Sequence, residues 1–364
     1  MCLLGAVEAL TCGFVVRGRA GSTVSDRSVL QAPSPWLVGY APKPWTALTD
    51  HLREAGYSDV ILEAAGLALR ARTGRLVDRF RDRLMLTIRD GDGRMVAFVG
   101  RAHPAAAEPT PRYLNSPTTP IYRKRDHLLG VCEGGAAAGS RATPVVVEGP
   151  MDALAVWVAS RDRHVAVALC GTALTSQQAD TLLALAGGPG RPVVVATDAD
   201  EAGRTAAEVA YRHLTALSLQ PWAADLPPGI DPAELLEKHG PCRLAATLMS
   251  GARPLIDDVI DHRVAAWSGR LRWVEGKVGA LRDIAPFIAA LPPDERARPI
   301  ARVVDLVGVE ATTACHEVSA AIPASRASDV VRPTRATGSS AGRDPTAPST
   351  STSWHAAVHR PISR

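Results

Sequence analysis

The chain has 364 residues with 46% hydrophobic and 21% charged side chains, which is ordinary for a soluble globular protein large enough for two or three cores. The net charge of +4 is too small by itself to indicate nucleic acid, and the six scattered cysteines, which form no Cys-X-X-Cys pair, exclude a zinc ribbon and a disulfide framework. Residues 1–16 lack the basic start of a signal peptide and no run of about 18 uncharged apolar residues occurs, so we expect a cytoplasmic protein with no membrane partner.

The predicted elements begin after an irregular lead-in over residues 1–35. Residues 45–54 and 58–70 have the patterns of two short helices. Apolar runs at 84–88 and 95–99 lie on either side of an Asp-Gly-Asp-Gly turn, which indicates a β-hairpin. The stretch from Arg70 to Arg125 holds 13 Lys and Arg against five Asp and Glu, so a polyanion would be attracted to it first. We therefore predict a basic α+β subdomain over residues 36–135.

Strands and helices alternate in the next part of the chain, which predicts an α/β unit over residues 136–242. Continuous β-branched runs at 144–147, 165–169 and 192–197 are typical of strands buried on both faces of a parallel sheet. Helical patterns at 151–160, 176–186 and 201–217 lie between and after these runs.

The remainder of the chain divides into two parts. Residues 243–323 have a mostly helical pattern with a break at Leu291-Pro292-Pro293 and predict a helical subdomain. Residues 324–364 are rich in Ser, Thr, Pro, Gly and Arg and contain too few apolar side chains for a core, so we predict a disordered tail.

Carboxylates follow two of the predicted strands at the points where these strands end. Glu148 follows the first strand, and Asp198 and Asp200 follow the third. Ligands of open α/β sheets gather at the carboxyl ends of the strands, so the three acids converge if their strands are neighbours. A hard divalent cation, Mg²⁺ or Mn²⁺, would relieve their repulsion. Asp152 falls in a first helical turn, where an acid is common without any metal.

These residues resemble a known family. Glu148-Gly149-Pro150-Met151-Asp152 together with Asp198-Ala199-Asp200 is similar to the TOPRIM signature of primases, topoisomerases, some nucleases and recombination proteins. The flanking segments Asp78-Arg79-Phe80-Arg81-Asp82-Arg83 and Arg112-Tyr113-Leu114-Asn115-Ser116-Pro117 resemble the catalytic core of bacterial DnaG-type DNA primases. The order of motifs agrees with that family from about Trp36 to Ile322.

The resemblance implies a Rossmann-like TOPRIM sheet that is flanked by the basic α+β subdomain and the helical subdomain. It also implies synthesis of RNA primers from ribonucleoside triphosphates on a single-stranded DNA template, with a replicative helicase as a candidate partner. Catalysis would depend on Glu148, Asp198 and Asp200, which would also hold Mg²⁺ or Mn²⁺ with help from Asp152 and Asp231. The side chains implied to contact template or nucleotide are Arg79, Arg81, Arg101, Arg112, Asn115 and Lys124.

The sequence also departs from the family pattern. Asp231-Pro232-Ala233 stands where the family usually has Asp-Pro-Asp, which puts a second metal in question. Arg112 replaces the usual Lys and keeps the charge with a different hydrogen-bond geometry. No segment resembles the zinc ribbon that the family uses for template recognition, so no zinc is expected.

Two other functions fit parts of the sequence. A TOPRIM nuclease or topoisomerase would share the acids, although a topoisomerase needs a tyrosine nucleophile and the five tyrosines have simpler explanations in motifs or packing. A non-catalytic, single-stranded-DNA-binding derivative of a primase would account for Ala233 and for the missing zinc ribbon.

Overall fold

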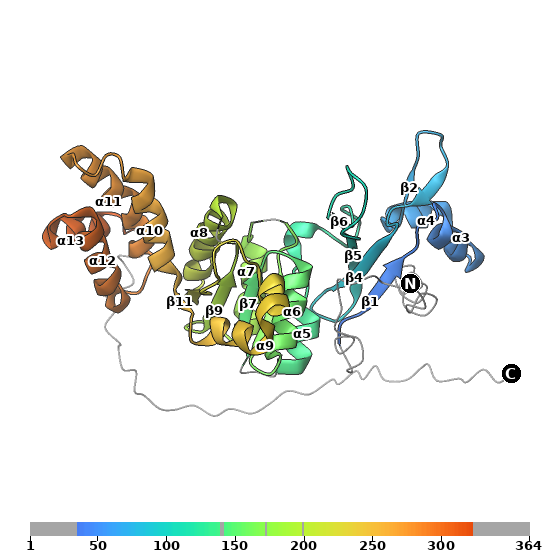
Figure 1. Ribbon diagram of the computed structural model, residues 1–364, viewed down its shortest axis with the longest axis horizontal. Helices are drawn as coiled ribbons and strands as arrows, with labels where there is room; N and C mark the ends of the chain where they lie inside the picture. Colours follow the sequence, from blue (N-terminus) through green and yellow to red (C-terminus); the bar gives the residue numbers. More distant parts are fainter. Residues whose placement is uncertain (1–34, 139–141, 172, 199, 323–364) are drawn as a thin grey trace, which may run out of the picture. The chain divides into compact units, whose positions relative to one another are not determined.

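The computed structural model describes residues 35–138, 142–171, 173–198 and 200–322 (Figure 1). Almost all of the predicted lead-in and the whole of the predicted tail lie outside these ranges. Within them, the α/β fold has an antiparallel sheet near the amino terminus, a mostly parallel sheet in the middle and a group of helices at the carboxyl-terminal end. No helix in the described ranges is long and apolar enough to cross a lipid bilayer.

The first sheet has four antiparallel strands in the order β1-β4-β5-β6. The predicted hairpin is confirmed, because β4 and β5 pair with Leu86 opposite Val99 and the chain turns between them at Asp90–Gly93. The Asp90 carboxylate accepts hydrogen bonds from the Asp92 and Arg94 amides, which stabilises the turn. The strands are β1 (Val38–Ala41), β4 (Arg83–Arg89), β5 (Met95–Ala102) and β6 (Tyr113–Asn115).

The helix predicted over residues 58–70 is wrong in its second half. Helix α4 (Asp59–Ala64) is short, and the chain then enters β2 (Ala68–Arg70), which pairs with β3 (Leu76–Asp78) in a two-stranded ribbon. Gly66 ends the helix with a φ of +69°, and a Cβ there would lie 2.7 Å from Pro117. The other predicted helix of this region is present as α3 (Ala47–Glu54).

The second sheet has the strand order β11-β10-β9-β7-β8, with parallel pairing throughout except at β11. All three predicted strands are present within one or two residues. The order differs from the sequence order, because β9 pairs with β7 and leaves β8 at one edge. The strands are β7 (Thr143–Val147), β8 (His164–Ala168), β9 (Pro192–Ala196), β10 (Gln220–Ala223) and β11 (Arg253–Pro254).

Helices cover both faces of this sheet. Val145 and Val147 point to one face, where they pack with α6 (Pro150–Ser160) and α9 (Pro232–Met249). Val146, one residue apart from each, points to the other face and packs in a core with α7 (Ser176–Ala186) and α8 (Glu201–Ala216). The alternation explains the continuous apolar runs, since every strand position needs an apolar side chain when both faces are covered.

The carboxyl-terminal part is helical, as predicted. It contains α10 (Leu255–Trp267), α11 (Val274–Ala289), α12 (Ala297–Val307) and α13 (Ala311–Ala320). The predicted break lies between α11 and α12, where η3 (Pro293–Glu295) intervenes. Helix α9 runs across the predicted boundary at residues 242 and 243, with a kink at Gly240, so the domain limits stay predictions.

Candidate active site

Two acids meet at the carboxyl edge of the second sheet. Strands β7 and β9 are parallel neighbours with Val147 opposite Ala196, so both chains leave the sheet at the same edge. The backbone amide of Asp198 donates a 3.1 Å hydrogen bond to Oε1 of Glu148. The strand ends therefore bring Glu148 and Asp198 into contact, as the sequence pattern predicts.

Two further acids begin the helices that start near this edge. The carboxylate of Asp200 accepts a 2.7 Å bond from the Gly203 amide at the start of α8, and that of Asp231 accepts a 2.7 Å bond from the Glu234 amide at the start of α9. Both are helix N-caps, which satisfy otherwise unpaired helical amides. Each cap bond uses a single carboxylate oxygen.

Asp152 is the most deeply placed acid of the group. Its side chain is 8% exposed, and it accepts hydrogen bonds from the amides of Gly149 at 3.0 Å and Ala233 at 3.3 Å. The same carboxylate thus connects the turn after Glu148 to the first turn of α9. A carboxylate buried in this way requires such donors, because an unsatisfied buried charge is costly.

The acids raise one another's proton affinity. Burial raises the pKa of Glu148, and the negative charges of Asp198, Asp200 and Asp231 raise it further against the hydrogen bond from the Asp198 amide. Burial and the charge of Asp231 raise the pKa of Asp152 to about 7. The pKa of Asp198 is also raised by burial and by Asp231 and Asp200, while Arg112 lowers it. The five carboxylates therefore share one electrostatic environment with an excess of negative charge.

Gly203 allows α8 to approach the edge closely. A Cβ at this position would lie 2.0 Å from the carbonyl oxygen of Asp198, so only glycine fits here. The hydroxyl of Thr197 donates to the Gly203 carbonyl, which adds a second bond between the strand end and the helix. The sequence analysis assigns no role to Gly203. Its spacing of three residues after Asp200 is that of an amide which bonds to a helix N-cap, and this spacing could have identified it.

Charges from the first sheet's part of the chain and from the acids act on one tyrosine. Burial raises the pKa of Tyr113, the charges of Arg101 and Arg112 lower it, and those of Asp152 and Asp231 raise it further. The guanidinium of Arg112 lies 5.5 Å from the Tyr113 ring centre. In the sequence, the place of Tyr113 in a primase-like motif explains its presence and assigns it no role at the site.

Asn115 and Lys124 join the two sheets near β8. The Asn115 side-chain amide donates to the carbonyl of Cys170 at 3.3 Å, and Lys124 Nζ donates to the carbonyl of Gly171 at 3.5 Å. Cys170 has a φ of +56° and Gly171 a φ of +86°, and the carbonyl groups of this turn accept the two bonds from Asn115 and Lys124.

Arg79 and Arg81 are engaged elsewhere. Arg79 donates two bonds to the backbone carbonyl of Asn115, and burial lowers its pKa. The guanidinium of Arg81 stacks 3.2 Å from the ring centre of Trp45. The charge of Arg112 thus acts on Asp198, and that of Arg101 acts on Tyr113, whereas Arg79 binds the backbone of Asn115.

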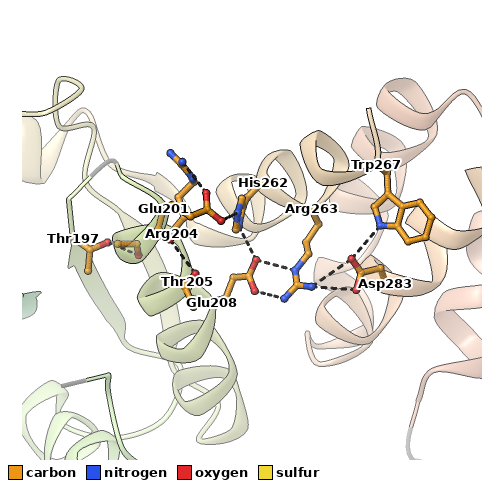
Figure 2. Close-up of polar contacts among 10 residues, drawn as sticks. Thr197, Glu201, Arg204, Thr205, Glu208, His262, Arg263, Trp267 and Asp283 are labelled. Atoms are coloured by element: carbon orange, nitrogen blue, oxygen red, sulfur yellow. Dashed lines mark hydrogen bonds and ion pairs between the residues drawn. The ribbon is translucent and has the colours of Figure 1, made fainter. Parts of the chain in front are cut away.

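Helix α8 is bound to the carboxyl-terminal helices by a polar network (Figure 2). His262 of α10 hydrogen-bonds to Glu208 at 2.8 Å and to Glu201, the neighbour of Asp200, at 3.1 Å. Arg263 pairs with Glu208 and also reaches Asp283 of α11 at 3.2 Å. His262 therefore binds the residue that follows Asp200, and Arg263 binds the middle of α8.

The chemistry of the donors fits a hard divalent cation. Carboxylate oxygens are the ligands that Mg²⁺ and Mn²⁺ prefer, and a cation would offset the repulsion that raises the pKa values of Glu148, Asp152 and Asp198. Among the described residues, no three His, Cys, Asp or Glu side chains already enclose a position for a metal ion. Arrangement of the acids around a cation would therefore require changes of side-chain conformation.

Comparisons with known proteins agree with this organisation. Residues 27–134 match the model of the DNA primase catalytic core, N-terminal domain, and residues 145–236 match a Toprim-like domain. A DNA primase of Streptomyces coelicolor is 36% identical over 272 residues, which cover 74% of this chain and 41% of the relative. The chain thus spans less than half the length of that relative.

Solved structures show the same similarity. The RNA polymerase domain of Mycobacterium tuberculosis primase DnaG is 31% identical with a TM-score of 0.62, and the match covers 76% of this chain and 87% of that one. A DnaG primase catalytic domain solved with bound single-stranded DNA is 30% identical with a TM-score of 0.62, over 76% of this chain and 84% of that one. The chain belongs to the family of DnaG-type bacterial DNA primases and contains the catalytic core that defines it.

Proposed function

We propose that this chain synthesises short RNA primers on single-stranded DNA by metal-dependent nucleotidyl transfer. The observation that carries the proposal is the contact of Glu148 with Asp198 at the sheet edge, with Asp152, Asp200 and Asp231 in the same electrostatic environment. The relative that was solved with single-stranded DNA supports the choice of template. Ribonucleoside triphosphates are the proposed substrates, and a replicative helicase is a candidate partner.

The acids are proposed to bind the metal ion and the arginines to bind phosphates. Glu148, Asp198 and Asp200 would hold Mg²⁺ or Mn²⁺, with Asp152 and Asp231 in support. The cation would activate the attacking 3′-hydroxyl and stabilise the charge that develops on the leaving pyrophosphate. Arg112, whose charge lowers the pKa of Asp198, and Arg101, whose charge acts with it on Tyr113, would bind triphosphate or template phosphates by charge-assisted hydrogen bonds.

Lys124 and Asn115 would orient the template. Both already contact carbonyl groups of the Cys170–Gly171 turn, so this turn fixes their place beside the edge of the sheet. Arg79 and Arg81 remain proposed template contacts, through the parts of their guanidinium groups that do not contact the Asn115 carbonyl or the Trp45 ring.

Primer synthesis on a single-stranded template, with Mg²⁺ or Mn²⁺, tests the proposal. The Asp198→Ala/Asp200→Ala variant should lose activity by about a thousandfold or more, because it removes charge that the cation needs. Asp294→Ala removes an exposed acid in η3 and should leave activity unchanged. Equal activity of the wild type and the double variant would refute the assignment of the site.

One observation favours a second candidate. Ala233 stands at a position where the family usually has an acid, and its amide already bonds to Asp152. A primase derivative that binds single-stranded DNA without catalysis would need no cation at this edge. Salt-sensitive DNA binding by a protein for which calorimetry detects no Mg²⁺ binding would favour this candidate over the first.

A further inference from the structure

The connection between α10 and α11 presents arginine and tryptophan side chains to solvent. We call residues 267–274 the arginine–tryptophan tip. Trp273 is 58% exposed and Val274 is 73% exposed, and Arg270 and Arg272 are exposed as well. Large exposed apolar side chains that gather at one place usually mark an interaction surface.

The tip has a fixed shape. The amide of Arg270 donates to the Trp267 carbonyl at 2.8 Å, and the amide of Trp273 donates to the Arg270 carbonyl at 3.0 Å. Gly276 packs beneath the turn, where a Cβ would lie 2.0 Å from the Arg270 carbonyl oxygen. A surface that is already ordered loses little conformational entropy when a partner binds.

Trp267 supports the tip from the side of α10. Its indole nitrogen donates to Asp283 at 3.3 Å, and its ring fills the space above Gly279, where a Cβ would lie 2.4 Å away (Figure 2). Arg270 lies 4.7 Å from the Trp267 ring centre, and Arg272 lies 5.1 Å from that of Trp273. Aromatic rings therefore hold both guanidinium groups in place.

The charge of the tip is wholly positive. Residues 267–274 contain two arginines and no acid, and the first acid that follows is Glu275. Within the described part of the chain neither arginine has an ion-pair partner, although Arg282, Arg298 and Arg302 of the neighbouring helices all do. Arginines that stay unpaired beside an exposed indole are suited to phosphates and a stacked base.

The tip also follows directly from a part of α10 that lies beside the candidate active site. His262 bonds to Glu201, which adjoins Asp200 in sequence. Trp267 comes five residues later, about 8 Å further along the helix axis. A polynucleotide that extends from the acidic edge along α10 could therefore reach the tip.

We propose that the arginine–tryptophan tip binds the single-stranded DNA template at a distance from the candidate active site. Arg270 and Arg272 bind backbone phosphates, and Trp273 stacks on one base. The inference rests on the proposed function, because it takes the template as the strand that is bound. The tip offers positive charge and a stacking ring but no side chain that would recognise a particular base. We therefore expect the affinity to depend on strand length and on salt concentration, and to depend little on base sequence.

Binding of fluorescent deoxyoligonucleotides to the whole chain tests the tip. With an oligonucleotide of about 30 nucleotides, Trp273→Ala should weaken binding by about tenfold, and Trp273→Phe should restore most of it because stacking persists. Arg270→Ala/Arg272→Ala should lower the slope of log affinity against log salt by about 1.4, the value for two phosphates of a single strand.

Controls separate the tip from the proposed function. Arg243→Ala removes an exposed arginine of α9 and should change neither affinity nor slope by more than a small fraction. Unchanged binding of the long strand by Trp273→Ala and by the double arginine variant would overturn the inference and leave the surface to a protein partner. If the wild type makes no primers and the tip variants still bind the long oligonucleotide more weakly, the proposed function is wrong. The inference that the tip binds single-stranded DNA would then still hold.

Discussion

At the scale of single residues, Asp152 has a strongly altered pKa. Burial and the charge of Asp231 raise this pKa to about 7, against the hydrogen bonds from the Gly149 and Ala233 amides, which lower it. The sequence shows only an acid in a first helical turn, for which the ordinary expectation is an ionised helix-start residue. Burial decides the difference, because it penalises the charged form.

The raised pKa of Asp152 predicts a pH dependence of stability. The folded state keeps this proton up to about pH 7, whereas the unfolded chain releases it near the ordinary value of 3.8. The free energy of unfolding should therefore fall as the pH rises from about 4 to 7 and level off above that range. Urea unfolding in steps of pH, without divalent cations, measures this, and Asp152→Asn should flatten that part of the curve. A profile of Asp152→Asn as steep as that of the wild type would contradict the prediction.

Gly203 gives a second prediction at this scale. Gly203→Ala places a Cβ against the Asp198 carbonyl oxygen, so α8 must shift and carry Asp200 with it. We expect a loss of about 1–3 kcal/mol in the free energy of unfolding and a loss of primer synthesis that exceeds the loss of folded protein. Gly91→Ala, in an open turn with no atom within 4 Å of the added Cβ, is the matched control. Wild-type activity in the Gly203→Ala variant would show that the close approach is dispensable.

At the scale of elements, the junction between α8 and α10 depends on one buried acid. Glu208 is 6% exposed, and both its oxygens bind partners from α10, His262 at one and Arg263 at both (Figure 2). Arg263 in turn reaches Asp283, so three helices are connected through one guanidinium. A planar guanidinium can serve two carboxylates at once, which Lys could not do in the same geometry.

Removal of Arg263 should therefore loosen the helices. Arg263→Ala leaves Glu208 buried with His262 alone, and we expect a loss of about 2 kcal/mol, below the range for a fully buried pair because Arg263 is partly exposed. Chemical denaturation measures the loss, and Arg263→Ala/Glu208→Ala should recover part of it since the buried charge is removed too. Arg282→Ala, which breaks a pair whose arginine is largely exposed, should cost under about 0.5 kcal/mol. If Arg263→Ala and Arg282→Ala lower the free energy of unfolding equally, the network around Glu208 does not determine the stability of the junction between α8 and α10.

At the scale of the whole molecule, two sheets must be kept together for the site to exist. The acids follow strands of the second sheet, and Arg101 and Arg112 come from the first sheet's part of the chain. Arg89 of β4 bonds at 2.9 Å to Glu133 of α5 (Val131–Ala138), and Glu133 is 1% exposed. This pair joins the two parts of the chain in their shared core.

The Arg89–Glu133 pair should control the cooperativity of unfolding. Arg89→Met leaves Glu133 buried without its partner, and we expect a loss of about 3–5 kcal/mol and a urea transition that separates into two steps. Arg89→Met/Glu133→Leu should regain most of the stability, because no buried charge remains. Arg94→Met breaks the exposed pair with Asp92 and serves as the control with a negligible effect. A single sharp transition in Arg89→Met would contradict the prediction.

The sequence by itself determined the local elements and the family. Continuous valine runs between helical patterns specify a sheet covered on both faces, and the Asp90–Gly93 turn specifies the hairpin, because these features depend on neighbours in the chain. The helix expected over residues 58–70 failed at Gly66, which has a positive φ and leaves no room for a Cβ beside Pro117, some fifty residues away in sequence.

Only the tertiary structure decided which residues meet. The strand order places β9 beside β7, and that order brings Asp198 to Glu148. It also brought the charges of Arg112 and Asp152 to act on Tyr113, and it turned Arg79 to the Asn115 backbone and Arg81 onto Trp45. The physical reason is that pairing of distant segments, burial and charge interactions depend on distances in space, whereas propensities and turn signals depend on residues a few positions apart.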